Sequence, residues 1–182
     1  MKNSFYTYDE LLNLGFKKVG KDCLISKYAR FYNIKNISIG NKVRIDDFCI
    51  LSGKITIGSY VHISLFSVLY GSKGIIIGNF CGTSARTIIY SAVDDFSGNY
   101  LINPMVPNVF KNVTGGIVKL MDFVQLGANT IVMPNITINT GTVTGAFTFV
   151  NKDLKPWKIY AGIPAKILKE RKKYLIQYAK KL

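Results

Sequence analysis

The residue in this sequence best suited to take up a proton near neutral pH is His62, its single histidine. Imidazole is the usual general base when a hydroxyl or an amine must lose a proton as it attacks an electrophile. His62 stands between Val61 and Ile63, and the pattern described below gives it an outward position. We therefore expect an accessible imidazole, either catalytic or held by a structural hydrogen bond.

Two adjacent acids, Asp94 and Asp95, are the second group that could do chemistry. They stand out because the chain has only ten acidic residues. One of them could accept a proton alone, or it could orient the imidazole of His62. The alternative is that both merely form an Asx-type turn. The residue types leave these possibilities open.

Metal-centred chemistry is not expected. One histidine cannot supply a site that needs two or three, and the three cysteines, Cys23, Cys49 and Cys81, are far apart with no C-x-x-C pair. This spacing suits neither a zinc site nor a disulfide framework. Because Cys49 and Cys81 take inward positions in the pattern below, they are predicted core residues. We expect no metal, and a reducing cytoplasmic location.

The composition indicates a single globular domain with a strong positive charge. The 182 residues carry 24 Lys and Arg against 10 Asp and Glu, a formal net charge of +14. At 48% hydrophobic residues the chain can bury a real core, and its length fits one domain. The longest uncharged run, 123–151, is interspersed with Gly, Thr, Asn and Pro, so no membrane span is expected. The N-terminus does not read as a signal peptide, because acids precede any long apolar stretch.

A six-residue period predicts the elements that hold these side chains. Six suits a short strand followed by a turn, and three such units make one coil of about 18 residues. We therefore predict an all-β solenoid in which the first and fifth residues of each hexapeptide point inward and stack on the next coil. The predicted first positions are Ile39, Ile45, Leu51, Ile57, Ile63, Leu69, Ile77, Thr83, Ile89, Leu120, Leu126, Val132, Ile138, Thr144 and Val150.

The solenoid is predicted to span residues 34–162, with one long interruption. Residues 91–116 lack the period and contain Pro104 and Pro107. Such a loop in a compact coil is more often functional than neutral. We expect it to protrude from the solenoid.

Both ends are predicted to carry caps, because terminal repeats would otherwise expose their cores. Residues 1–33 form the N-terminal cap, with a short helix that follows the capping-box pair Thr7 and Glu10. Residues 163–182 are predicted to form a C-terminal helix, with Pro164 at its first helical position.

The period and the closing string Ala161-Gly162-Ile163-Pro164-Ala165-Lys166 together resemble the hexapeptide-repeat acyltransferases. The resemblance covers the chain from about residue 34 to its end. It implies a left-handed parallel β-helix and a homotrimer with active sites between subunits. It also implies an acetyltransferase that takes its acyl group from acetyl-CoA.

The resemblance assigns the donor side to small residues and lysines. The closing motif contacts CoA in the family, and the turn that contains Lys152 matches one whose lysine approaches CoA. The Gly-Ala pairs at 127–128 and 145–146 hold matching places in two coils, where small residues let pantetheine lie close to the backbone, although simple coil packing would also require them. The predicted CoA-binding residues are Gly127, Ala128, Gly145, Ala146, Lys152, Ala161, Gly162 and Lys166.

On the acceptor side this chain departs from the family. In its sugar O-acetyltransferases the catalytic histidine sits near the start of the long loop, where this sequence has Asp94 and Asp95. The predicted catalytic residues are therefore His62 and Asp94. An aspartate from an adjacent subunit could orient His62, and an amine acceptor could bind already neutral and need no strong base. The predicted substrate-binding residues, by nearness to the loop, are Arg86, Tyr90, Asp95 and Asn103.

We thus predict a direct acyl transfer to a hydroxyl of a sugar or polysaccharide precursor. The closest alternative acceptor is the amine of a nucleotide-linked amino sugar. A second alternative, a non-enzymatic protein that binds anionic polymers, rests on the +14 charge alone. No nucleic-acid motif supports that alternative, so no nucleic-acid partner is expected.

Overall fold

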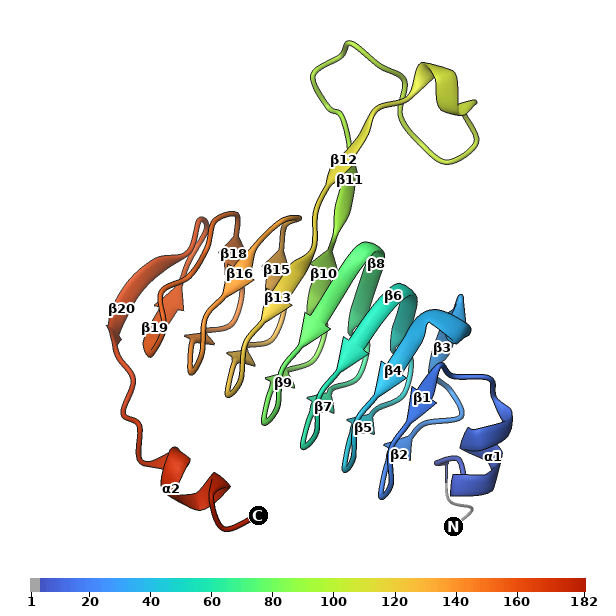
Figure 1. The fold of residues 1–182 in the computed structure, drawn as a ribbon. Helices are drawn as coiled ribbons and strands as arrows, with labels where there is room; N and C mark the ends of the chain where they lie inside the picture. Colours follow the sequence, from blue (N-terminus) through green and yellow to red (C-terminus); the bar gives the residue numbers. More distant parts are fainter. Residues whose placement is uncertain (1–3) are drawn as a thin grey trace.

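The computed structural model describes residues 4–182, and the chain winds into a solenoid of stacked coils (Figure 1). Each coil contributes short strands that pair in parallel with the equivalent strands of the coils before and after it. This pairing satisfies the backbone N–H and C=O groups between coils. The strands stack into three faces, here named A, B and C.

Face A carries the exposed His62. It consists of β2 (Leu24–Ile25), β5 (Arg44–Ile45), β7 (His62–Ile63), β9 (Gly82–Thr83), β14 (Gln125–Leu126), β17 (Val143–Thr144) and β19 (Lys158–Ala161). In each coil before the last, the chain then passes from face A to face B.

Faces B and C are joined by two long strands, β6 (Ile50–Ile57) and β8 (Val68–Ile77), which run from one face to the other. Face B also contains β3 (Arg30–Tyr32), β10 (Ile88–Tyr90), β15 (Ile131–Val132) and β18 (Phe149–Val150). Face C also contains β1 (Lys18–Val19), β4 (Ile37–Ile39), β13 (Val118–Leu120) and β16 (Thr137–Ile138).

The residues that the period predicts to point inward are buried in the core. Every predicted first position is at most 2% exposed. The buried hydroxyls among them are paired across coils: Thr83 with Ser67 at 3.3 Å, and Thr144 with Thr130 at 3.0 Å. Among residues 4–182 no buried side-chain nitrogen or oxygen lacks a partner. The interior therefore combines stacked aliphatic groups with satisfied polar ones.

The interruption at 91–116 is an arm that projects away from the solenoid (Figure 1). Its base is an antiparallel hairpin of β11 (Ala92–Asp94) and β12 (Val113–Gly115), and its tip contains the 3₁₀ turn η2 (Asn108–Phe110). The arm leaves after β10 and returns before β13, so it grows from the corner between faces B and C.

The solenoid begins earlier than residue 34. The helix α1 (Tyr8–Asn13) forms with both hydrogen bonds of the predicted capping box, but β1, β2 and β3 already pair with strands of the next coils. The sequence period missed this coil because the 3₁₀ turn η1 (Ile34–Asn36) lengthens the step there. The predicted cap at 1–33 is therefore shorter in the structure.

The C-terminal helix predicted at 163–182 is wrong for most of its length. Residues Lys166–Glu170 form β20, antiparallel to β19, and only Leu175–Ala179 form the helix α2. The cause is that β19 ends face A with an unpaired edge, which a returning strand can satisfy. No helix among the described residues approaches the length and apolarity needed to cross a bilayer.

Candidate active site

A cleft of about 490 Å³ lies where the arm leaves the corner between faces B and C. Ser52, Tyr70, Ser72 and Tyr90 line it from the coils, and Asp94 lines it from the base of the arm. The structure thus brings together two residues predicted separately, one for substrate binding and one for catalysis. Asp94 is the one ionisable carboxylate among the described residues that line this cleft.

Two stacked tyrosine rings line the same cleft as this carboxylate. Tyr70 and Tyr90 are register partners on β8 and β10, and their rings stack with centroids 5.4 Å apart. Stacked coils place equivalent side chains one above the other, so this geometry follows from the fold. A flat wall beside one carboxylate suits a ring-shaped substrate that carries an amine or a hydroxyl.

Two other predicted loop residues shape the arm instead of lining the cleft. The Asp95 carboxylate accepts hydrogen bonds from the Ser97 amide at 2.8 Å and the Asn112 side chain at 3.0 Å. The side chain of Ser97, then its amide, then Asn112 hold the pKa of Asp95 below its usual range. The Asn103 side chain accepts a bond from the Met105 amide at 3.0 Å. The Asx-type turn considered for these acids is therefore found at Asp95.

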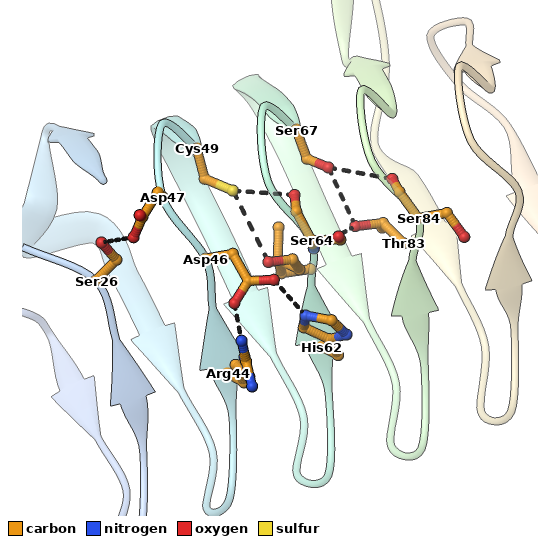
Figure 2. A network of polar contacts seen from close by, with 11 residues as sticks. Ser26, Arg44, Asp46, Asp47, Cys49, His62, Ser64, Ser67, Thr83 and Ser84 are labelled. Carbon is orange, nitrogen blue, oxygen red and sulfur yellow. Dashed lines mark hydrogen bonds and ion pairs between the residues drawn. The ribbon is translucent and has the colours of Figure 1, made fainter. Parts of the chain in front are cut away.

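His62 belongs to a different cluster, shown in Figure 2. Its Nε2 lies 2.7 Å from Oδ2 of Asp46, and the other oxygen of Asp46 accepts a 2.6 Å bond from Arg44. Burial raises the pKa of Asp46, but the bonds from Arg44 and His62 outweigh it, and the net pKa is lowered. An aspartate from the preceding coil of the same chain therefore orients His62, which lies on face A and does not line the cleft of Asp94.

Ser84, which the sequence pattern did not single out, lies at the corner between faces A and B. Its amide donates to the Leu126 carbonyl at 2.8 Å, and its carbonyl accepts from the Thr87 hydroxyl at 2.8 Å. The backbone is thus held on both sides, while the residue remains partly exposed. The period could have revealed it, because Ser84 follows Thr83 as Gly127 follows Leu126.

The Gly-Ala pairs occupy this same corner in later coils. A Cβ on Gly127 would lie 2.5 Å from the carbonyl carbon of Gly145, so coil packing alone requires glycine there. Ala128 and Ala146 follow these glycines at the surface, and Ala161 and Gly162 close the series. Arg86, predicted to bind substrate, is exposed at this corner and does not line the Asp94 cleft.

Two predicted lysines meet at the C-terminal end of the solenoid. Lys152 and Lys166 line a hollow of about 390 Å³ together with Lys155, Asp153 and Tyr160. Three ammonium groups around one hollow suit a phosphorylated ligand. Within residues 4–182 no cluster of three or more His, Cys, Asp or Glu side chains could hold a metal ion.

The cysteines are not nucleophiles. Cys23, Cys49 and Cys81 are buried free thiols. Burial raises the pKa of Cys49 to about 11 and that of Cys81 to about 12. Since the thiolate is the reactive form, these raised pKa values do not suit a nucleophile, and Cys49 and Cys81 are buried in the core as predicted.

No protein-family model matches the chain. The solved structure of the S84C mutant of AntD, an N-acyltransferase from Bacillus cereus, is 49% identical and superposes with a TM-score of 0.97, covering 100% of this chain and 97% of that one. It is a complex with dTDP-4-amino-4,6-dideoxyglucose and coenzyme A. A second AntD structure, of the D94A mutant with dTDP and coenzyme A, has a TM-score of 0.96 at 49% identity and covers 98% of this chain and 97% of that one.

A curated relative from Escherichia coli, dTDP-4-amino-4,6-dideoxy-D-glucose acyltransferase, is 40% identical over 171 residues, 92% of this chain and 89% of the relative. This chain belongs to the hexapeptide-repeat sugar acyltransferases. The resemblance to this family and the left-handed parallel β-helix that the resemblance implied are thereby confirmed, and the protein is an acyltransferase.

Sugar O-acetyltransferases of the family match less of the chain. Galactoside O-acetyltransferase of Escherichia coli is 30% identical over 116 residues, which is 56% of each chain. Over its whole length, therefore, this acyltransferase is more similar to enzymes named for an amino sugar than to this hydroxyl-acylating one.

Proposed function

We propose that this protein transfers an acyl group from acyl-CoA to the amine of a nucleotide-linked 4-amino-4,6-dideoxy sugar. The observation that carries the proposal is the match to AntD along the whole chain, at 49% identity and a TM-score of 0.97. These values favour the amine acceptor over the sugar hydroxyl, which was the main expectation from the sequence.

The cleft supplies the acceptor chemistry. The carboxylate of Asp94 accepts a hydrogen bond from the sugar amine, and it takes the proton that the nitrogen loses as it attacks the thioester carbonyl. The ring wall of Tyr70 and Tyr90 holds the sugar beside this carboxylate. AntD has been solved with its residue 94 changed from Asp to Ala, and this chain has an aspartate at the same number.

Ser84 supplies the second catalytic contact. Its hydroxyl donates a hydrogen bond to the carbonyl oxygen that gains negative charge during the attack. The hydrogen bonds of the Ser84 amide and carbonyl, which hold the backbone that carries this hydroxyl, support this role. AntD has also been solved with its residue 84 changed from Ser to Cys.

The donor lies along the corner between faces A and B. The phosphates bind at Lys152 and Lys166, and pantetheine follows the small residues at 161–162, 145–146 and 127–128 toward Ser84. This direction places the thioester at Ser84. After the attack the carbon–sulfur bond breaks, and the leaving thiolate takes the proton that Asp94 received from the amine. Because the amine attacks the thioester directly, the acyl group passes to the nitrogen and no covalent acyl-enzyme forms.

The active site is completed between two subunits of a homotrimer. In one chain Ser84 lies at the corner between faces A and B, whereas Asp94 lies on the arm at the corner between faces B and C. A projecting arm that carries a carboxylate can deliver it to the Ser84 corner of a neighbour. This arrangement unites the two residues on one substrate.

A thiol-release assay tests the proposal. Acetyl-CoA and 3-hydroxybutyryl-CoA are offered with plain sugars, dTDP-sugars that carry only hydroxyls, and dTDP-4-amino-4,6-dideoxyglucose. Thiol release with the amino sugar alone, and an amide in the product by mass spectrometry, is the expected result. Release with the hydroxyl sugars at equal or greater kcat/KM would overturn the amine assignment.

A further inference from the structure

A second groove, of about 340 Å³, runs along face C and contains three lysines. Lys17 precedes β1, Lys54 lies in β6 and Lys73 lies in β8, and all three side chains are exposed. We call it the lysine groove. It shares no lining residue with the Asp94 cleft or with the hollow of Lys152.

No acid offsets these charges. The other polar residues that line the groove are Asn36, Ser38 and Thr56, and the remainder are apolar or glycine. Among the residues that the structure describes, none of the three lysines forms an ion pair. Three like charges on one face repel each other, and a bound anion would offset this repulsion. The net charge of the chain, +14, adds to the attraction for an anion.

The placement of two lysines suits two neighbouring phosphates. Lys54 and Lys73 lie on the paired strands β6 and β8 of adjacent coils, at the point where the register between these strands shifts. Two flexible ammonium side chains that line one groove from adjacent coils can each contact one phosphate of a diphosphate. Lys17 lies further along the groove, toward the N-terminal coil.

The lysine groove continues from the Asp94 cleft along the same two turns. In the turn between faces B and C, Ser52 lines the cleft and Lys54 lines the groove. In the same turn of the next coil, Ser72 lines the cleft and Lys73 lines the groove. The Lys73 amide donates to the Ser91 hydroxyl at 2.9 Å, which ties it to the residue after Tyr90. One extended ligand can therefore occupy both.

We propose that the lysine groove binds the diphosphate of the nucleotide-sugar acceptor, with Lys54 and Lys73 as its contacts. The sugar then lies in the cleft beside Asp94, and the diphosphate crosses the turn to face C. The identity of the diphosphate rests on the proposed function, but anion binding by the groove does not. The groove thereby distinguishes a nucleotide-linked sugar from the free sugar.

Calorimetry with dTDP and with inorganic pyrophosphate tests the groove without any acyl donor. The variant is Lys54→Gln with Lys73→Gln, and the control is Lys180→Gln with Lys181→Gln, which removes the same charge at the exposed C-terminus. We expect dTDP to bind the groove variant at least about tenfold more weakly, and the control as the wild type does. Added salt should weaken wild-type binding more than binding to the groove variant.

Kinetics separate this inference from the proposed function. With dTDP-4-amino-4,6-dideoxyglucose, kcat/KM of the groove variant should fall about tenfold, and with the free amino sugar it should not change. Unchanged dTDP affinity in the groove variant, or no dTDP binding to the wild type, would overturn the inference. If dTDP binds the wild type but not the groove variant, and no thiol is released from acyl-CoA, the proposed reaction is contradicted and the diphosphate site is supported. Equal melting temperatures confirm that the variants fold.

Discussion

Asp94 and His62 differ in what surrounds their reactive atoms. The carboxylate of Asp94 lies in a cleft beside two tyrosine rings, whereas Nε2 of His62 is already hydrogen-bonded to Asp46. A base must reach the proton that it removes. These surroundings support our proposal that Asp94, and not His62, takes the proton of the acceptor.

Replacing each residue separately checks this assignment. Asp94→Asn should lower kcat about 100-fold or more, because an amide cannot accept the amine proton. His62→Gln, which keeps a hydrogen-bonding partner for Asp46, should keep more than a tenth of the activity. Initial rates of thiol release measure both. A loss in His62→Gln as deep as that in Asp94→Asn would return histidine to the role of base.

Asp46 links the Arg44–Asp46–His62 cluster to acid stability. Its pKa is lowered in the folded chain from an ordinary value of 3.8. The ionised form therefore stabilises the fold above about pH 4, and this stabilisation is lost as the pH falls through the folded-state pKa. Asp46→Asn should lower the urea midpoint at pH 7, and the gap to wild type should close toward pH 3. A gap that stays constant with pH would rule out the ionic contribution.

At the scale of elements, stacking decides which residues the corners accept. Tyr60, Phe80 and Phe123 stand one above another at the corner between faces C and A, with centroids 4.8 and 5.1 Å apart. All three have positive φ, near 60°, which costs energy for a residue with a side chain. Ring stacking in successive coils offsets this cost.

At the corner between faces A and B, Gly127 and Gly145 stack on each other, and close backbone contact at Gly127 excludes a side chain. Gly127→Ala should destabilise the fold by about 1–3 kcal/mol, because its Cβ would meet the Gly145 backbone at 2.5 Å. Gly145→Ala is the matched control, since the nearest neighbours of its Cβ would be the Ala161 methyl at 3.3 Å and the Tyr160 carbonyl oxygen at 3.6 Å. Chemical denaturation of both variants measures the difference. Equal losses would show that close backbone contact is not what demands glycine at 127.

At the scale of the whole molecule, a site shared between subunits should permit complementation. Ser84→Ala and Asp94→Asn should each be nearly inactive alone. Mixed trimers, formed by co-expression with two affinity tags, should regain part of the activity, because some interfaces combine an intact Ser84 with an intact Asp94. Doubly tagged material without activity, or a monomeric mass by light scattering, would contradict the shared site.

The six-residue period in the sequence was enough to predict the solenoid, its core positions and the protruding arm. Each inward residue, from Ile39 to Val150, is identified by its place in a repeat whose neighbours are the same repeat one coil away. Such a fold is nearly one-dimensional, so local spacing carries its long-range contacts. The closing motif at 161–166 likewise indicates the family, because its residues are consecutive in the chain and need no long-range contact to be recognised.

Only the tertiary structure decided which polar residues share a site. His62 and Asp94 look equally catalytic in sequence, but the coil places one beside Asp46 on face A and the other at the arm. The strand at 166–170 could not be predicted, because its partner is the open edge of the last coil. The lysine groove was missed for the same reason, because side chains from different coils become neighbours only when the coils stack. Ser84 was within reach of the period, since it follows Thr83 as Gly127 follows Leu126.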